Sequence, residues 1–433
     1  MKLLKELFQR RTTLWIALEL ILVTLALWWT FDPVLVDQTV FHLPMGYDVD
    51  RLVKFQTANT FTKNEQYQQS GVIFDEQNIL LQKVEEMDEV EVAYIAENTP
   101  LGFESQSLGS YFSNGNDSVM AWQYHFTPDS KMFEVYGIES LTPDVPTSEL
   151  THDCHDQQSV IITRSLAMAL YGTIDLAGRT LKAQKLEWVE NEEGDGGDLR
   201  WVGCDYNIRA VVKNVRIEPY DCNNPVVFLC ESGSKTNAPI IARLREGVDA
   251  TWFMETHNQE VQSQLVTEHQ YVRDILSARQ SGNETIERIG GGRRTRRNLL
   301  IAAFFAINLC FGVVGTLLMY TRQRREEAGV RRAYGATRLN VFWGFIREAW
   351  LLTTISVIAG CIIYFQFAKA HGLYEDYMTH NPLVRLWFND FATHFMVVSL
   401  FVYLAILCVV LIATAIPAWR ICRSEITEAL KDE

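Results

Sequence analysis

RQRREEAGVRRAYGATR, Arg322 to Arg338, lies between two long apolar runs and decides the fold of the chain. The segment sets six arginines against only Glu326 and Glu327. Lys and Arg next to membrane spans resist translocation, so a segment this basic is predicted to lie in the cytoplasm. Gly329 and Gly335 interrupt what is otherwise a short polar helix. We interpret the segment as a cytoplasmic loop that can dock a partner; the alternative is a charge run that only fixes the topology.

Four apolar runs surround this loop, and each approaches the roughly 20 residues that a helix needs to cross a bilayer. They predict spans at 13–31, 298–320, 348–369 and 394–417. Around these spans the sequence predicts a cytoplasmic lead-in at 1–12, a periplasmic domain at 32–297 and the coupling loop at 321–347. A periplasmic loop at 370–393 and a cytoplasmic tail at 418–433 complete the chain as given. The expected fold class is an α-helical membrane protein with four transmembrane helices and a large α+β extracytoplasmic domain between the first two.

Charges beside the spans predict the orientation. The first and last spans are flanked by Lys2, Lys5, Arg10, Arg11, Arg420, Arg423 and Lys431. The positive-inside rule therefore predicts a multi-pass membrane protein with both termini in the cytoplasm. Four arginines between Arg293 and Arg297 conflict with this topology, because they stand at the outer mouth of the second span. The rule is weak beside long translocated domains, so the topology is kept.

The outer region alternates segments of helical and strand-like periodicity, which predicts a mixed α+β domain. Helices are expected at Asn78–Met87, Arg164–Tyr171 and Thr251–Leu265, and strands at Val90–Ile95, Ser159–Thr163 and Pro239–Leu244. The stretch Trp201–Ile217 suggests strand, turn and strand around Asp205–Asn207, and Gly194–Asp198 suggests a loop tip.

Several isolated features invite a chemical interpretation. Glu19 is a lone acid within the first span, where a carboxylate must be paired, protonated or turned toward protein. We favour a helix–helix contact over a proton relay. The cluster His152–Asp156 is too dense to wrap one tetrahedral ion and is expected to be a polar loop, not a metal site. Gly290–Gly292 is expected to be a hinge.

The outer region also holds four cysteines, Cys154, Cys204, Cys222 and Cys230. An oxidising compartment makes one or two disulfides plausible, with a pairing among Cys204, Cys222 and Cys230 preferred; free buried thiols are the alternative.

No enzymatic motif is present in the sequence: it contains neither a P-loop nor a G-x-S-x-G, H-E-x-x-H or kinase signature. The net charge of −14 argues against nucleic acid as a partner. The chain is therefore not expected to be an enzyme, and no metal or cofactor site is expected in it.

Three stretches, in order, resemble the MacB/FtsX-type ABC transporter permeases. The inner loop of that family is matched by Arg325, Glu327, Gly329, Val330, Arg331, Arg332, Ala333, Gly335, Ala336 and Glu348, with Ala328 in place of a larger aliphatic residue. The C-terminal ending is matched by Pro417, Ala418, Arg420, Ala429 and Leu430, but Ile426 replaces a second proline. The outer stretches Ser159–Ala183 and Ala210–Val215 resemble the periplasmic core domain, although Ala210 and Leu176–Ala177 depart from its pattern.

The resemblance implies the permease subunit of a type VII ABC system in the bacterial inner (cytoplasmic) membrane. A separate cytoplasmic ABC ATPase, which binds the ATP and Mg, would dock on Arg325, Glu326, Glu327, Gly329, Val330, Arg331, Arg332, Ala333, Tyr334, Gly335 and Ala336. Mechanotransmission would then drive efflux of peptides or small molecules by a homodimer, or by a heterodimer with a paralogue, with a periplasmic adaptor and outer-membrane channel as further partners. The alternatives are an FtsX-like regulator of an envelope hydrolase, a lipoprotein-release permease, or a membrane receptor without transport.

Overall fold

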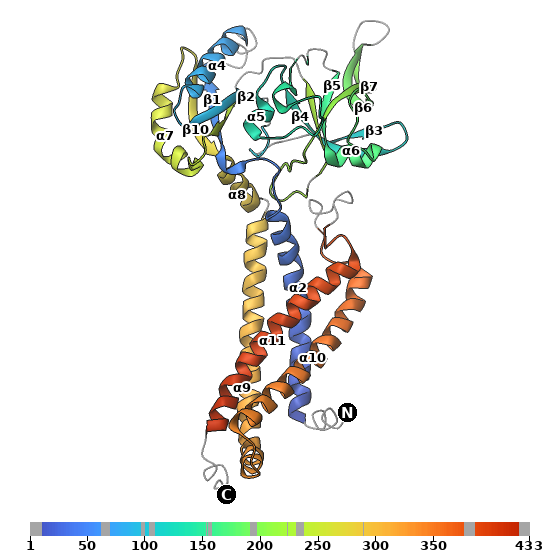
Figure 1. Ribbon diagram of the computed structural model, residues 1–433, viewed down its shortest axis with the longest axis vertical. Coiled ribbons are helices and arrows are strands. Elements are labelled where there is room, and N and C mark those ends of the chain that lie inside the picture. The colour runs from blue at the N-terminus through green and yellow to red at the C-terminus, as the bar shows by residue number, and fades with distance from the viewer. Residues whose placement is uncertain are drawn as a thin grey trace. The chain divides into compact units, whose positions relative to one another are not determined.

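The computed structural model describes residues 11–61, 70–96, 100–103, 109–152, 154, 158–190, 197–222, 224–230, 238–288, 290–375 and 386–423. Within these ranges, the side chains of 11–12, 70, 185–190, 197–201, 313–314, 316–333, 420–421 and 423 are not described. The lead-in, the tip around Gly194 and the tail after Arg423 lie outside these ranges. The chain divides into a helical unit, 1–39, 290–380 and 385–433, and an α+β unit, 40–289 and 381–384 (Figure 1).

The helical unit is built from α2 (Arg11–Phe41), α9 (Gly291–Ala333), α10 (Arg338–His371) and α11 (Phe391–Arg423). Within the part of the chain whose side chains are described, three stretches are long and apolar enough to cross a membrane: Thr13–Phe41, Arg338–His371 and Phe391–Trp419. These agree with the first, third and fourth predicted spans, although α2 continues to Phe41. A fourth span in α9 stays a prediction, since many of its side chains lie outside that search.

An aromatic cluster packs the helical unit together. The Trp28 ring of α2 is fully buried and stacks on Tyr364 of α10 and Phe395 of α11, with ring centroids 4.2 and 5.2 Å apart. Its indole N–H donates to the Ser399 hydroxyl over 3.1 Å. A buried tryptophan usually needs such an acceptor, and this one fixes α2 against α11.

The α+β unit contains a sheet in the order β10-β1-β9-β2, with all pairs antiparallel. Its strands are β1 (Leu52–Asn59), β2 (Val90–Ile95), β9 (Ile240–Leu244) and β10 (Gln270–Ser277). One face holds Val53, Phe55 and Ile240, which pack with Leu80 of α4 (Ser70–Glu85) and Phe253 of α7 (Ala250–Gln264). Because strand side chains alternate, the neighbouring Leu52 and Ile241 face the opposite way into a second core.

That second core is shared with a closed barrel, whose strand order is β3-β4-β8-β5-β7-β6. The barrel strands are β3 (Gly109–Ser113), β4 (Ser118–Phe126), β5 (Ser159–Thr163), β6 (Thr180–Glu190), β7 (Gly197–Val212) and β8 (Val226–Cys230). The short helices of the unit are α5 (Met132–Tyr136), α6 (Arg164–Tyr171) and α8 (Ala278–Arg288), with 3₁₀ turns η1 (Val49–Arg51) and η2 (Thr147–Glu149). The α5 side chains Phe133 and Tyr136 join the sheet to the barrel through this core.

Most of the expected segments agree with the structure. Helix α6 ends at Gly172, which takes a left-handed φ of 68° that favours glycine. The expected turn at Asp205–Asn207 is wrong. Strand β7 passes straight through these residues, because its neighbours β6 and β5 pair with it in succession along that length. The polar pair Asp205 and Asn207 stands on exposed positions of an alternating strand, and that alternation gave the false turn signal.

Candidate functional site

The predicted docking segment lies at the junction of α9 and α10. Helix α9 runs without interruption from Gly291 to Ala333, so Arg325–Ala333 are its last turns; of these residues the structure describes only the backbone. Gly335 then reverses the chain with a φ of 94°, and the Thr337 hydroxyl caps α10 by accepting from the Asn340 amide over 3.2 Å. Gly329, expected to interrupt a helix, does not interrupt this one.

Two faces of the turn after α9 differ in their surroundings. Ala336 packs on a small core formed by Val341 and Phe345 of α10 with Ala418 and Cys422 of α11. Tyr334, in contrast, is 90% exposed, and Leu339 and Trp343 are also exposed, at 59% and 62%. Large apolar side chains held this open on an anchored turn can make contact with a partner protein.

Close helix contacts inside the helical unit depend on glycine. A side chain at Gly312 of α9 would overlap the Glu19 carboxylate, which therefore lies directly against the α9 backbone. A Cβ at Gly360 of α10 would come within 2.8 Å of the Thr24 side chain. Small residues of this kind let membrane helices approach each other. The Glu19 position supports the interpretation as a helix–helix contact; its role stays a prediction.

The unexpected arginines at the start of α9 have a local explanation. Arg294 forms a two-pronged ion pair with Asp37 of α2, at 3.0 Å from Nε to Oδ2 and 3.1 Å from Nη2 to Oδ1. Asp37 is almost fully buried, and the Tyr374 hydroxyl also donates to it. A buried charge requires such a partner. At least one of these arginines is therefore present as a counter-ion to an acid of α2, not as a topological signal.

A second buried acid, Asp32, ties α2 to α11. Its Oδ1 lies 2.6 Å from Nε2 of His394, and its Oδ2 accepts from the Tyr374 amide. Both Asp32 and His394 are buried. Sequence reasoning missed these pairs because the partners are separated by more than 250 residues. The available signal was the presence of two acids just after an apolar run.

The chain leaving α2 is fastened to the α+β unit by Arg216. This side chain is fully buried, and among the described residues its guanidinium donates to the main-chain carbonyls of Val40, Leu43, Pro219 and Asp221. Val40 and Leu43 belong to the end of α2 and the turn after it, where helix carbonyls lack partners and a cation is favoured. Gly46 adds to the closure, since any side chain there would overlap the Asn214 carbonyl.

The four cysteines of the α+β unit lie in different parts of it. Cys204 lies on β7, packed against the α6 side of the barrel. Cys154 and Cys230 share one core, where the Cys230 thiol donates to the Cys154 carbonyl. Cys222 is buried. Disulfide bonding among these four remains a prediction.

Two clusters of the α+β unit contain side chains of the kinds that bind metals. Within the described residues, Glu76, Glu268 and His269 bring three potential ligand atoms within 4.8 Å of one another. However, Glu76 already accepts hydrogen bonds from Thr267, the His269 amide and the His269 ring. These bonds connect α4 to the turn before β10, which gives Glu76 a structural role. In the expected polar loop, His152 pairs with Asp129 over 2.9 Å; residues 153 and 155–157 lie outside the described ranges.

Comparison with known proteins defines the class. Residues 299–426 match the family model "FtsX-like permease C-terminal". The match covers the C-terminal helices of the chain and confirms the resemblance to MacB/FtsX-type ABC transporter permeases.

A relative can also be named. Over 99 residues the chain is 30% identical to the macrolide export ATP-binding/permease protein MacB of Marinobacter nauticus. The matched stretch covers 22% of this chain and 15% of the relative's length. Among solved structures, the periplasmic region of MacB from Actinobacillus actinomycetemcomitans is 14% identical, with a TM-score of 0.29 over 58% of this chain and 98% of that one. The extracellular domain of the transporter YknZ from Gram-positive bacteria is 9% identical, with a TM-score of 0.28 over 51% and 98%. Scores this low carry no argument, and the family assignment does not rest on them.

Proposed function

We propose that this chain couples ATP hydrolysis by a cytoplasmic ABC ATPase to a conformational change of the α+β unit, and that the change drives efflux of peptides or small molecules. The observation that carries the proposal is the continuity of α9. The basic segment is the direct extension of a helix that begins at Gly291. A helix of 43 residues is about 65 Å long and can displace as a rod.

The anchored turn after α9 supports docking at this end. Ala336 is held by the α10–α11 pair while Tyr334 stays exposed, so a partner that grips Tyr334 would move two helices together with α9. In this proposal both termini and the turn are cytoplasmic, ATP and Mg are bound by the ATPase, and this chain needs no cofactor of its own. The permease works as a dimer, with an adaptor and outer-membrane channel as further partners.

The first test is purification of the tagged full-length chain from its native cells in mild detergent, followed by mass spectrometry of the bound proteins. We expect an ABC ATPase in stoichiometric amount. A co-purifying adaptor would support efflux, and an envelope hydrolase or a lipoprotein would instead favour the regulatory or lipoprotein-release alternative. Reproducible purification of an intact, folded permease without any ATPase would overturn the proposal.

A further inference from the structure

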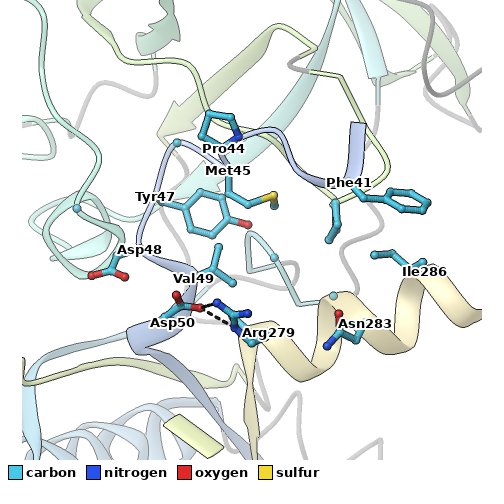
Figure 2. Close-up of a pocket in the computed structure, with 16 residues that line it drawn as sticks. Phe41, Pro44, Met45, Tyr47, Asp48, Val49, Asp50, Arg279, Asn283 and Ile286 are labelled. Carbon is cyan, nitrogen blue, oxygen red and sulfur yellow. Dashed lines mark hydrogen bonds and ion pairs between the residues drawn. The ribbon is translucent and has the colours of Figure 1, made fainter. Parts of the chain in front are cut away.

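One cavity of the α+β unit lies between the two segments that connect this unit to the membrane helices. It has a volume of about 650 Å³. One wall is the segment Phe41–Asp50, which follows α2, and another is α8, which precedes α9. Figure 2 shows these two walls facing each other across the cavity. Every residue that lines it belongs to the α+β unit.

The lining combines an apolar surface with a few polar groups. Phe41, Met45, Val49 and Ile286 supply apolar side chains, and Asn283 adds an amide. At the rim the Arg279 guanidinium is paired with Asp50, with 2.7 Å from Nε to Oδ1. Small-molecule sites have this size and this balance of apolar walls and few polar groups.

One polar group in the cavity lacks a partner. The Tyr47 hydroxyl is buried and forms no hydrogen bond with any described residue. Figure 2 shows the hydroxyl directed into the space enclosed by Met45, Val49 and Phe41. The ring is held edge-on by Tyr136, with centroids 5.4 Å apart, and Gly102 leaves room for the hydroxyl. Burial, with the charges of Tyr124 and Glu218, raises the pKa of Tyr47 well above 10, so it stays a neutral donor.

We propose that this cavity binds a small amphipathic molecule, with its apolar body against Phe41, Met45 and Ile286 and a neutral or cationic head at Tyr47 and Asn283. The preference for the head follows from charge: Arg279, the one cation among the described lining residues, is already paired with Asp50, and Asp48 is paired with Arg51 and Arg243, so no unpaired cation faces an anionic head. Given the proposed function, a ligand here lies between the segment that follows α2 and the helix α8 that precedes α9. Its binding is therefore coupled to any movement of α2 against α9.

The test uses the full-length chain in lipid nanodiscs and a benzophenone amphiphile that carries a trimethylammonium head, with a sulfonate analogue for comparison. Labelled peptides are mapped by mass spectrometry. We expect saturable labelling of residues 41–50 and 278–286 by the cationic probe and at least about fivefold weaker labelling by the anionic one. Val49→Trp should fill the cavity and abolish saturable labelling, whereas Val72→Trp, at an exposed position of α4, should not change it.

Tyr47→Phe keeps the ring and removes only the hydroxyl, so it remains informative if Val49→Trp misfolds. Loss of one hydrogen bond predicts about five- to tenfold weaker half-saturation.

A nanodisc lipid with a photoreactive acyl chain identifies the source of the ligand. Labelling of the same peptides, sensitive to Val49→Trp, would make the ligand a membrane lipid. Labelling that is not saturable, or is equal in wild type, Val49→Trp and Tyr47→Phe, would overturn the site. Binding without any effect on ATP-driven output would overturn only the coupling.

Discussion

At the scale of single residues, Arg216 holds together more backbone segments than any residue predicted as a site. Its guanidinium satisfies four carbonyls in a place that water does not reach. Replacing it by methionine keeps much of the volume but leaves those carbonyls unpaired. We expect Arg216→Met to destabilise the protein by about 3–5 kcal/mol, measured as thermal unfolding of the detergent-solubilised chain. Arg273→Met, at an exposed arginine of β10, should change stability by no more than about 0.5 kcal/mol. Similar effects of the two substitutions would contradict the role of Arg216.

Asp221, next to Arg216, makes stability depend on pH. Burial raises the pKa of Asp221 to about 7, although Arg216 and hydrogen bonds from Cys222 and Asn224 oppose the rise. Between pH 4 and 7 the folded state then binds a proton that the unfolded state has released, so stability falls as pH rises through that window. We expect the unfolding temperature to drop from pH 5 to pH 8, and Asp221→Asn to flatten this dependence. Asp117→Asn, on the surface, is the control; an unchanged slope in Asp221→Asn would count against the assignment.

The contact between Glu19 and α9 provides a matched pair of glycines. Gly312→Ala should push α9 away from α2, because the added methyl group overlaps the Glu19 carboxylate. Gly315→Ala, less than one turn further along the same helix, meets nothing within 4 Å. We expect lower expression and a lower unfolding temperature for Gly312→Ala only.

Glu19→Gln should leave transport nearly unchanged, because the Glu19 side chain is interpreted as a helix–helix contact. Loss of transport with normal expression would instead favour a proton relay.

At the scale of elements, α9 carries the functional proposal. The double charge reversal Arg331→Glu and Arg332→Glu is expected to uncouple ATP hydrolysis from output while the protein still folds and inserts, because both residues lie in the last turn before the exposed Tyr334. The measurement is ATPase activity alongside transport in proteoliposomes. Arg293→Glu, at the opposite end of α9, serves as the control for net charge. Undiminished coupling in the double variant would remove the docking assignment.

The sequence predicted local elements well and contacts poorly. The strand Ser159–Thr163 and the helix Arg164–Tyr171 could be predicted because apolar periodicity and Gly172 mark them locally. The barrel could not, since its closure depends on pairings such as that of β4 with β8, about 100 residues apart. Arg216 gave no signal for the same reason: its carbonyl partners are defined by the fold and not by residue type. The docking segment was recognised only through a pattern of residues, and the exposure of Tyr334 needed the structure.

At the scale of the whole molecule, the predicted topology has the α+β unit outside the inner membrane and the turn after α9 in the cytoplasm. Trp252→Cys and Tyr334→Cys introduce thiols at exposed positions of the α+β unit and of the turn after α9. A membrane-impermeant maleimide is expected to label Trp252→Cys in cells whose outer membrane alone is opened, and Tyr334→Cys only after the inner membrane is broken. Labelling of both thiols before inner-membrane lysis would overturn the predicted topology.

The hydrogen bonds from Arg216 to four main-chain carbonyls also constrain the order of events during synthesis. The end of α2 is made 176 residues before the arginine that satisfies the Val40 carbonyl. During translocation this helix end therefore stands open until nearly the whole barrel has been made, and β7 has brought its last residues back to it. The helix end can therefore be closed only after residue 216 has been made, while the barrel still awaits β8, and a ribosome that stalls before residue 216 leaves the first span inserted but without this anchor.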